Sequence, residues 1–209
     1  LIMQAVAEAN QAYINSKMVT RLKLVRSILT NYVESGDMRT DLGRLSATND
    51  GFMDELHRVR DVYGADLVSL IEEDSQYCGL GYLMNTLSTT WAPWAFRVVH
   101  HGCATGYYSF AHEIGHNQGA HHDLANCSDA TIFPYAHGHQ EPYNSFRTVM
   151  AYNCPGGCTR VSYFSNPNVL YNGLPTGEAN YAANAMAIDQ TAPTVAAFRE
   201  RATELPPGC

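Results

Sequence analysis

Apolar residues recur at helical spacing in four stretches of the chain. In residues 1–16, Ile2, Val6, Ala9 and Tyr13 share one face of a helix that would pack against a core. The same spacing predicts three further helices over residues 51–63, 105–118 and 178–202. The sequence predicts a cap at Asn49 or Asp50, a stop at Gly119 and a kink or break near Pro193.

Short apolar runs between these helices predict β-strands. Residues 20–33 alternate apolar and polar positions, which predicts a long strand with a bulge. Shorter strands are predicted over residues 65–73, 78–84 and 95–101. Residues 34–51 predict a loop with a short turn, and residues 123–175 show little periodicity. The order of elements predicts an α/β fold with a mostly irregular second half that ends in a helix.

The composition is that of a folded chain with no nucleic-acid partner. Hydrophobic residues make up 45% of the 209 positions and charged residues 16%, so the chain can bury a core. No stretch approaches the roughly 18 consecutive apolar residues that a membrane-spanning helix needs. At roughly 100–200 residues per domain, the length predicts one domain. The net charge of −7 offers no basic face for a phosphate backbone.

Six cysteines indicate disulfides and an oxidising compartment, so we expect a secreted protein. Six thiols allow fifteen pairings in principle. Cys154 and Cys158 flank Pro-Gly-Gly, a turn that brings two Cα atoms within disulfide range, so we expect them to pair. The chain starts at Leu1 with no visible signal peptide, which is expected of a processed or truncated product.

Residues 112–122 carry the chemistry, because they fit the pattern H-E-x-x-H-x-x-G-x-x-H. His112 and His116 are four residues apart and project from one helix face, and Gly119 can turn the chain so that His122 reaches the same cation. Three imidazoles and a water form the open tetrahedral site of a catalytic zinc ion. We therefore expect one catalytic Zn²⁺, with Glu113 taking the proton of a zinc-bound water that attacks a peptide bond.

Two other classes of protein are compatible with a zinc site. A binding module that keeps zinc for structure would not need a general base such as Glu113. A zinc hydrolase acting on a non-peptide amide would share the helix motif. Cleavage of casein or gelatin with and without a chelator separates these classes from a zinc metalloendopeptidase.

The extended motif resembles that of the metzincin metalloproteases. Their second signature, a Met-containing turn, is matched by Met150 in Thr-Val-Met-Ala-Tyr, 28 residues after His122. The resemblance implies a zincin fold with a twisted mixed sheet, an active-site helix, and Met150 as an apolar floor beneath the zinc ion. It also implies that Tyr152 binds zinc or hydrogen-bonds the tetrahedral intermediate.

Six further segments resemble the bacterial peptidyl-Asp metalloendopeptidase family: AVAEANQAY, GADLVSLI, YCGLGYLM, GCATGYYSFAHEIGHNQGA, FRTVMAYNCPGGC and SNPNVLYNGLPTG. The resemblance covers nearly the whole chain. It implies one catalytic domain, with an upper subdomain over about 1–119 and a lower subdomain over about 120–209. Relatives usually have a β-strand before the first helix, and its absence would leave a gap in the sheet. A monomer is expected.

The predicted strand over residues 78–84 is the expected binding site of a polypeptide substrate. The substrate would lie extended along residues 78–84 as an exposed edge strand, where Gly79, Leu80 and Gly81 leave backbone groups open for an added strand. The resemblance to the peptidyl-Asp enzymes implies an acidic residue after the scissile bond, and this residue would need a cation in its pocket. Arg147 and Arg160 are the candidates, and the place of Arg160 after the turn slightly favours it.

The remaining cysteines and histidines have weaker assignments. The family resemblance pairs Cys78 with Cys103, and elimination alone leaves Cys127 with Cys209. His121 is one residue out of register with the zinc ligands and is expected to face solvent. His137 and His139 alternate in a loop and are a weak candidate for a second metal site. Calcium binding has no support from any loop with EF-hand spacing.

Overall fold

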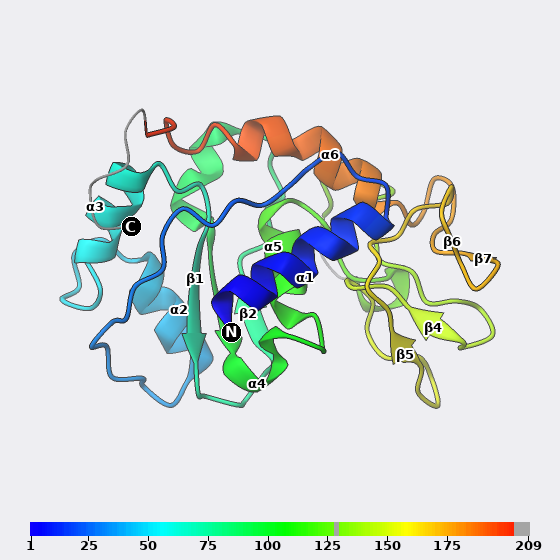
Figure 1. The fold of residues 1–209 in the computed structure, drawn as a ribbon, viewed down its shortest axis with the longest axis horizontal. Coiled ribbons are helices and arrows are strands. Elements are labelled where there is room, and N and C mark those ends of the chain that lie inside the picture. The colour runs from blue at the N-terminus through cyan, green and yellow to red at the C-terminus, as the bar shows by residue number, and fades with distance from the viewer. Residues whose placement is uncertain (128–129, 203–209) are drawn as a thin grey trace.

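A small mixed sheet forms the centre of the fold (Figure 1). The structure is a computed structural model that describes residues 1–127 and 130–202. Strand β1 (Val68–Glu72) pairs in parallel with β3 (Phe96–His100), and β3 pairs antiparallel with β2 (Gly79–Gly81). The strand order is β1-β3-β2, so β2 lies at an edge. The predicted strands at 65–73, 78–84 and 95–101 are confirmed, each a few residues shorter than predicted.

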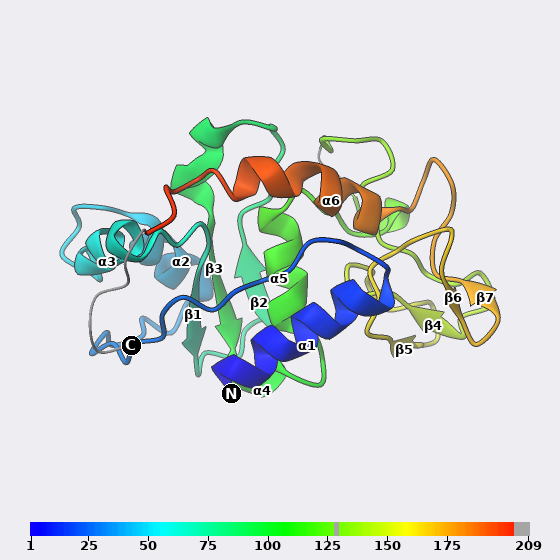
Figure 2. The same ribbon diagram turned by 45° about the horizontal axis from the view of Figure 1, so that its top comes forward.

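Helices flank this sheet. Helix α1 (Ile2–Asn15) crosses in front of α5 (Ser109–Asn117), and α6 (Asn184–Val195) lies along one side (Figures 1 and 2). Helix α2 (Met38–Ser46) packs against β3 and β2 from behind the sheet, and α3 (Glu55–Tyr63) lies on the left in Figure 1. Short helical turns are α4 (His101–Ala104), η1 (Thr89–Trp94) and η2 (Leu124–Asn126). The apolar face of α1 packs with α5 and Met150 in the main core.

The chain after α5 is mostly irregular, as predicted. It holds only two-residue strands among the described residues: β4 (Phe146–Arg147) pairs with β5 (Thr159–Arg160), and β6 (Leu170–Tyr171) pairs with β7 (Leu174–Pro175). These strands lie away from the central sheet (Figure 1). None of the helices over residues 1–127 and 130–202 is long and apolar enough to cross a membrane.

The predicted strand over residues 20–33 is wrong. This segment forms neither helix nor strand. Its residues from Thr20 to Ile28 line a groove of about 900 Å³, and Val68, Ser69 and Ile71 of β1 line it too. A strand is stabilised by a hydrogen-bonded neighbour, and over the described part of the chain this segment has no ladder partner. Alternation alone therefore did not produce a strand.

One loop prediction and the boundaries of two predicted helices also differ from the structure. Residues 38–46, predicted as loop, form α2, because the Asp37 side chain caps the helix by accepting the Arg39 N–H at 3.0 Å and Met38, Leu42 and Leu45 are buried. Helix α3 begins at Glu55 rather than at 51. Helix α6 is shorter than 178–202 and ends at Val195, two residues after Pro193, in agreement with the predicted kink or break near Pro193.

Glu72, at the end of β1, gives the stability of the fold a pH dependence. The carboxyl is 2% exposed, and burial followed by the charges of Asp41, Glu34 and Asp74 raises its pKa from 4.5 to about 8. The folded chain therefore binds a proton that the unfolded chain has lost at neutral pH. This contribution to stability is complete below pH 4.5 and is lost as the pH rises through about 8.

Replacing Glu72 by Gln is expected to raise the melting temperature at pH 8 and to leave it nearly unchanged at pH 4.5, because Gln carries no charge to bury. Thermal unfolding across this pH range in calcium-free buffer measures the effect. Glu73→Gln, at the exposed neighbouring residue, is the control. An equal shift at both pH values would contradict the assignment.

Candidate zinc-protease active site

Helix α5 presents His112, Glu113 and His116, all less than 8% exposed. The two histidines lie one turn apart, and Glu113 follows the first of them. The helix ends at Asn117, and Gly119 adopts a φ of +82° that turns the chain back. A side chain at Gly119 would also meet Ile132 at 2.7 Å. The turn brings His122 to the same place as the two helix histidines, as the spacing predicts.

The three imidazoles converge through their Nε2 atoms. His122 Nε2 lies 3.2 Å from His112 Nε2 and 3.0 Å from His116 Nε2. A tetrahedral zinc ion with Zn–N bonds of about 2.0–2.1 Å holds its nitrogen ligands roughly 3.3 Å apart. The three residues therefore fit a zinc ion with three histidine ligands.

Backbone carbonyls orient two of these rings. His112 Nδ1 donates to Val149 O at 2.8 Å, and His116 Nδ1 donates to Ala120 O at 3.0 Å. A proton on Nδ1 leaves the lone pair on Nε2 for a metal. Burial, and then the neighbouring histidines, lower the pKa of His116 to about 3 and of His122 to about 4. The pKa of His112 is lowered as well, mainly by burial, so neutral rings are favoured.

Strand β2 lies directly over Glu113. A Cβ added at Gly79 would meet Glu113 Cγ at 2.7 Å, and one at Gly81 would meet Glu113 Oε2 at 3.1 Å. The two glycines share a face of β2, and the absence of side chains on this face makes room for the Glu113 carboxylate. Burial raises the pKa of Glu113 to about 8, against the charges of Arg97 and Arg160. Neither Arg97 nor this reason for the glycines was found in the sequence.

Met150 lies beneath the metal-binding helix. Its side chain is fully buried, and its Sδ is 2.5 Å from the position of a Cβ added at Gly115. Gly115 precedes His116 on α5, so the sulfur packs against the helix between the two histidine ligands. The role predicted for Met150, an apolar floor beneath a zinc ion, stays a prediction.

Tyr152 lies beside the third histidine. Its ring centroid is 4.2 Å from that of His122, and its backbone N–H donates to Asp123 Oδ2 at 2.9 Å. Burial, and then Glu113 and Asp123, raise the pKa of the Tyr152 hydroxyl, so it keeps its proton. Asp123 joins the Met150 turn to the chain after His122, a link that the sequence motif alone did not reveal.

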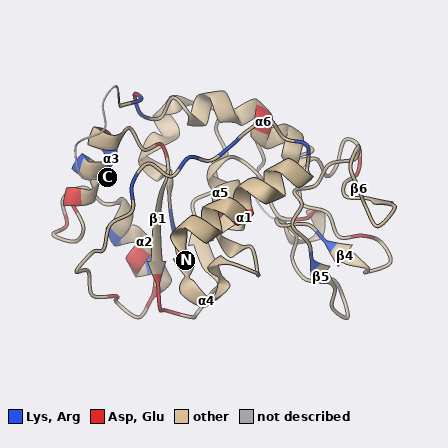
Figure 3. Cartoon of the chain, in the orientation of Figure 1, with Lys and Arg blue, Asp and Glu red and all other residues tan. Residues whose placement is uncertain are grey.

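Two arginines gather around Tyr107. Arg147 in β4 donates to Tyr107 Oη at 3.0 Å and to Ala151 O at 2.7 Å. Arg160 in β5 donates to Tyr107 O at 3.1 Å and lies 4.6 Å from the ring centroid. Both strands are blue in Figure 3. Burial, and then Arg147, lower the pKa of Arg160 to about 10, while Glu113 and Tyr152 act in the opposite direction.

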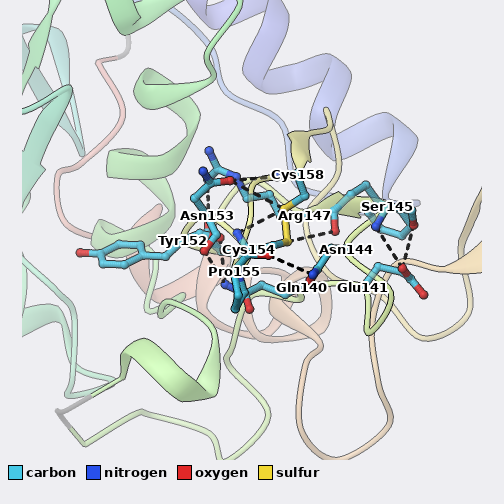
Figure 4. Close-up of a disulfide and its surroundings, with 12 residues drawn as sticks. Gln140, Glu141, Asn144, Ser145, Arg147, Tyr152, Asn153, Cys154, Pro155 and Cys158 are labelled. Carbon is cyan, nitrogen blue, oxygen red and sulfur yellow. Dashed lines mark hydrogen bonds between the residues drawn. A yellow bond between two sulfur atoms is a disulfide. The ribbon is translucent and has the colours of Figure 1, made fainter.

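Disulfides fix both sides of the site. Cys78 pairs with Cys103 and Cys154 with Cys158, so both predicted pairs are confirmed. The second pair follows the Met150 turn, and Tyr152 points away from it (Figure 4). The third pairing cannot be placed because Cys209 lies outside the described residues.

His121 was expected to face solvent, and this is wrong. It is 3% exposed, because the turn after Gly119 folds the chain back against residues 136–138: His121 N–H donates to Ala136 O at 2.7 Å, and Gly138 N–H donates to His121 O at 3.0 Å. The group of potential metal ligands that contains His121 also contains His137 and Cys127, but not His139. Register on α5 could not predict this, because His121 lies beyond the helix.

Comparison with known proteins agrees with the geometry. The family described as metallo-peptidase family M12B, reprolysin-like, matches residues 1–123. Peptidyl-Asp metalloendopeptidases from Xanthomonas campestris and Stenotrophomonas maltophilia are 48% and 47% identical over 95% of this chain. The chain spans about half the length of these relatives, 46% and 48% respectively. A peptidyl-Asp metalloendopeptidase from Pseudomonas fragi is 37% identical, and the match covers 92% of this chain and all of the relative.

A solved structure described as a chaperone–substrate complex shares the fold, with a TM-score of 0.72. It is 20% identical, and the match covers 96% of this chain and 32% of that one. The sequence matches identify the family, and the convergent histidines next to Glu113 agree with it. The chain belongs to the reprolysin-like metallopeptidases of family M12B.

Proposed function

We propose that the chain is a secreted zinc endopeptidase that cuts polypeptides before an acidic residue. The observation that carries the catalytic part is the convergence of three histidines beside the buried carboxyl of Glu113: the Nε2 atoms of His112 and His116 lie within 3.2 Å of that of His122. A structural metal site would be closed by a fourth protein ligand. The two disulfides support an oxidising, extracellular location.

Each proposed catalytic residue has one task. A zinc ion bound by His112, His116 and His122 supplies Lewis acidity and lowers the pKa of a water molecule. Glu113 takes the proton of the attacking water and then gives it to the leaving amine. The Tyr152 hydroxyl donates a hydrogen bond to the oxyanion that develops on the substrate carbonyl. Met150 supports the helix from below.

The proposed substrate lies extended along β2. This strand pairs with β3 on one side. Over the described part of the chain no strand pairs with its other edge, which is therefore available to a substrate peptide. Leu80 would present its backbone beside the substrate, while Gly79 and Gly81 keep the strand close to Glu113. The substrate would then run between an upper subdomain, about 1–119, and a lower one, about 120–209.

Arg160 is the proposed partner of the acidic side chain. The relatives carry the name peptidyl-Asp metalloendopeptidase, which supports an acidic preference here. Among the described residues, neither Arg147 Nε nor Arg160 Nε has a hydrogen-bond partner. Arg147 already supports the Met150 turn through Ala151 O, whereas the charge of Arg160 acts on Glu113 and Tyr152. Arg160 therefore has the better position to meet a substrate carboxylate.

Removal of zinc tests the catalytic proposal. Dialysis against a chelator is expected to abolish casein cleavage, and addition of Zn²⁺ is expected to restore it, because no other group in the site supplies a Lewis acid. Circular dichroism before and after dialysis shows whether the fold survives. Proteolysis that persists after complete removal of zinc would refute the proposal.

Replacing Arg160 by Ala is expected to lower the preference for Asp over Leu after the scissile bond about tenfold. A hydrogen bond to a charged group contributes about 1.5 kcal/mol or more, and 1.4 kcal/mol is a factor of ten. The measurement is kcat/KM for two peptides that differ only at this residue. Arg147→Ala is the matched comparison and should lower stability more than selectivity. An unchanged ratio in Arg160→Ala would contradict this assignment.

A further inference from the structure

A second group of metal-binding side chains lies next to the catalytic histidines. It consists of His121, Cys127 and His137, and one potential ligand atom from each lies within 4.8 Å of the other two. His121 and His137 are 3% and 4% exposed, and Cys127 is half-buried. The mechanism uses none of these side chains.

The backbone holds the two histidines side by side. His121 and His137 form an isolated parallel β-bridge, in which His121 N–H donates to Ala136 O at 2.7 Å and Gly138 N–H donates to His121 O at 3.0 Å. Their ring centroids are 5.8 Å apart. Residues 16 positions apart in the sequence are thus fixed in one place, which lowers the entropic cost of binding an ion between them.

Each of these imidazoles uses its Nδ1 atom to contact the backbone of His122. His137 Nδ1 donates to His122 O at 3.0 Å, which leaves the lone pair on His137 Nε2. His121 Nδ1 accepts the His122 N–H at 2.7 Å. Binding an ion through His121 Nε2 would move the ring proton to Nδ1 and replace this one hydrogen bond by a metal–nitrogen bond.

We propose that His121, Cys127 and His137 bind a second zinc ion, distinct from the catalytic one. Two imidazoles and a thiolate are a donor set typical of zinc. Bonds of about 2.0–2.1 Å to nitrogen and 2.3 Å to sulfur would place these donors roughly 3.3–3.6 Å apart. Small side-chain rotations reach this arrangement from separations of 4.8 Å or less.

The second ion would fix the position of the third catalytic ligand. When the ion binds, His137 keeps its hydrogen bond to the His122 carbonyl, and the His122 ring faces His112 and His116. A metal that immobilises His121 and His137 would therefore hold the loop that carries His122. A water molecule would complete the coordination of the second ion. This ion would take no part in the reaction, and its protein ligands would act as positioning residues.

The number of bound metal ions tests the proposal. The 209-residue chain, loaded with ZnCl₂ and freed of loosely bound metal by gel filtration, is expected to retain two zinc ions. His116→Ala and Cys127→Ala should each retain one. His139→Ala, at a partly buried histidine of the same loop, is the matched control and should retain two.

Cobalt distinguishes the two sites without relying on a variant of the cluster. Co²⁺ bound to Cys127 is expected to give a near-ultraviolet sulfur-to-metal charge-transfer band, because the catalytic site has no sulfur ligand. The band should persist in His116→Ala and disappear in Cys127→Ala. It can be read from the wild-type protein even if the cysteine variant does not fold.

Three results would overturn the second site: one zinc per wild-type chain, no sulfur-to-cobalt band, or a disulfide involving Cys127 in the zinc-loaded protein by peptide mapping. None of these results would contradict the catalytic site, because the zinc ion that is lost in His116→Ala is the one bound by His112, His116 and His122. Conversely, loss of proteolysis with two zinc ions bound would count against the proposed activity and not against the second site.

Discussion

Replacing Glu113 by Gln is expected to lower kcat by about 10²–10⁴-fold, because a positioned general base contributes that much to proton transfer. Gln has nearly the shape of Glu and fits the space beneath β2, but it cannot take a proton from water. The three histidine Nε2 atoms are not changed by the substitution. Zinc binding and the melting temperature should therefore stay close to those of the wild type.

Steady-state kinetics and zinc content measured on the same preparation separate chemistry from folding. His116→Ala is the comparison variant, because it should lose both activity and the catalytic zinc. Proteolysis near the wild-type rate in Glu113→Gln would mean that another group serves as the base. Loss of zinc in this variant would mean that the carboxylate supports the metal site rather than the proton transfer.

The metal-binding group was predictable from the sequence because its geometry is local. Four residues along a helix place His112 and His116 on one face, and a glycine with positive φ at 119 returns the chain to His122. These relations need no knowledge of the rest of the fold. The Met150 turn was found for a different reason, the resemblance to a known family.

Contacts between residues far apart in the chain could not be predicted from the sequence. The burial of His121 depends on residues 136–138 folding back against it, and the role of Gly79 depends on β2 lying over Glu113. Residues 20–33 show the opposite failure, because their alternation predicts a strand but the described chain provides no partner for it. Helix α2 was missed although Asp37 and three apolar residues signal it locally.

Replacing Gly79 by Ala is expected to lower kcat/KM about 100-fold while zinc stays bound. The new Cβ would lie 2.7 Å from Glu113 Cγ, closer than two carbon atoms can approach, so the carboxylate or β2 must move. A displacement of about 1 Å in a catalytic group can cost a factor of about 10². Gly43→Ala is the control, because a Cβ there meets nothing within 4 Å.

A double-mutant cycle tests whether Gly79 acts through the carboxylate. If the added methyl group harms activity only by displacing the base, Gly79→Ala should have little further effect in the Glu113→Gln background, where no base is left to displace. If it harms substrate binding along β2 instead, the two effects should multiply, and KM should rise in both backgrounds. A multiplicative result would leave β2 as the substrate strand but would remove the proposed reason for glycine at position 79.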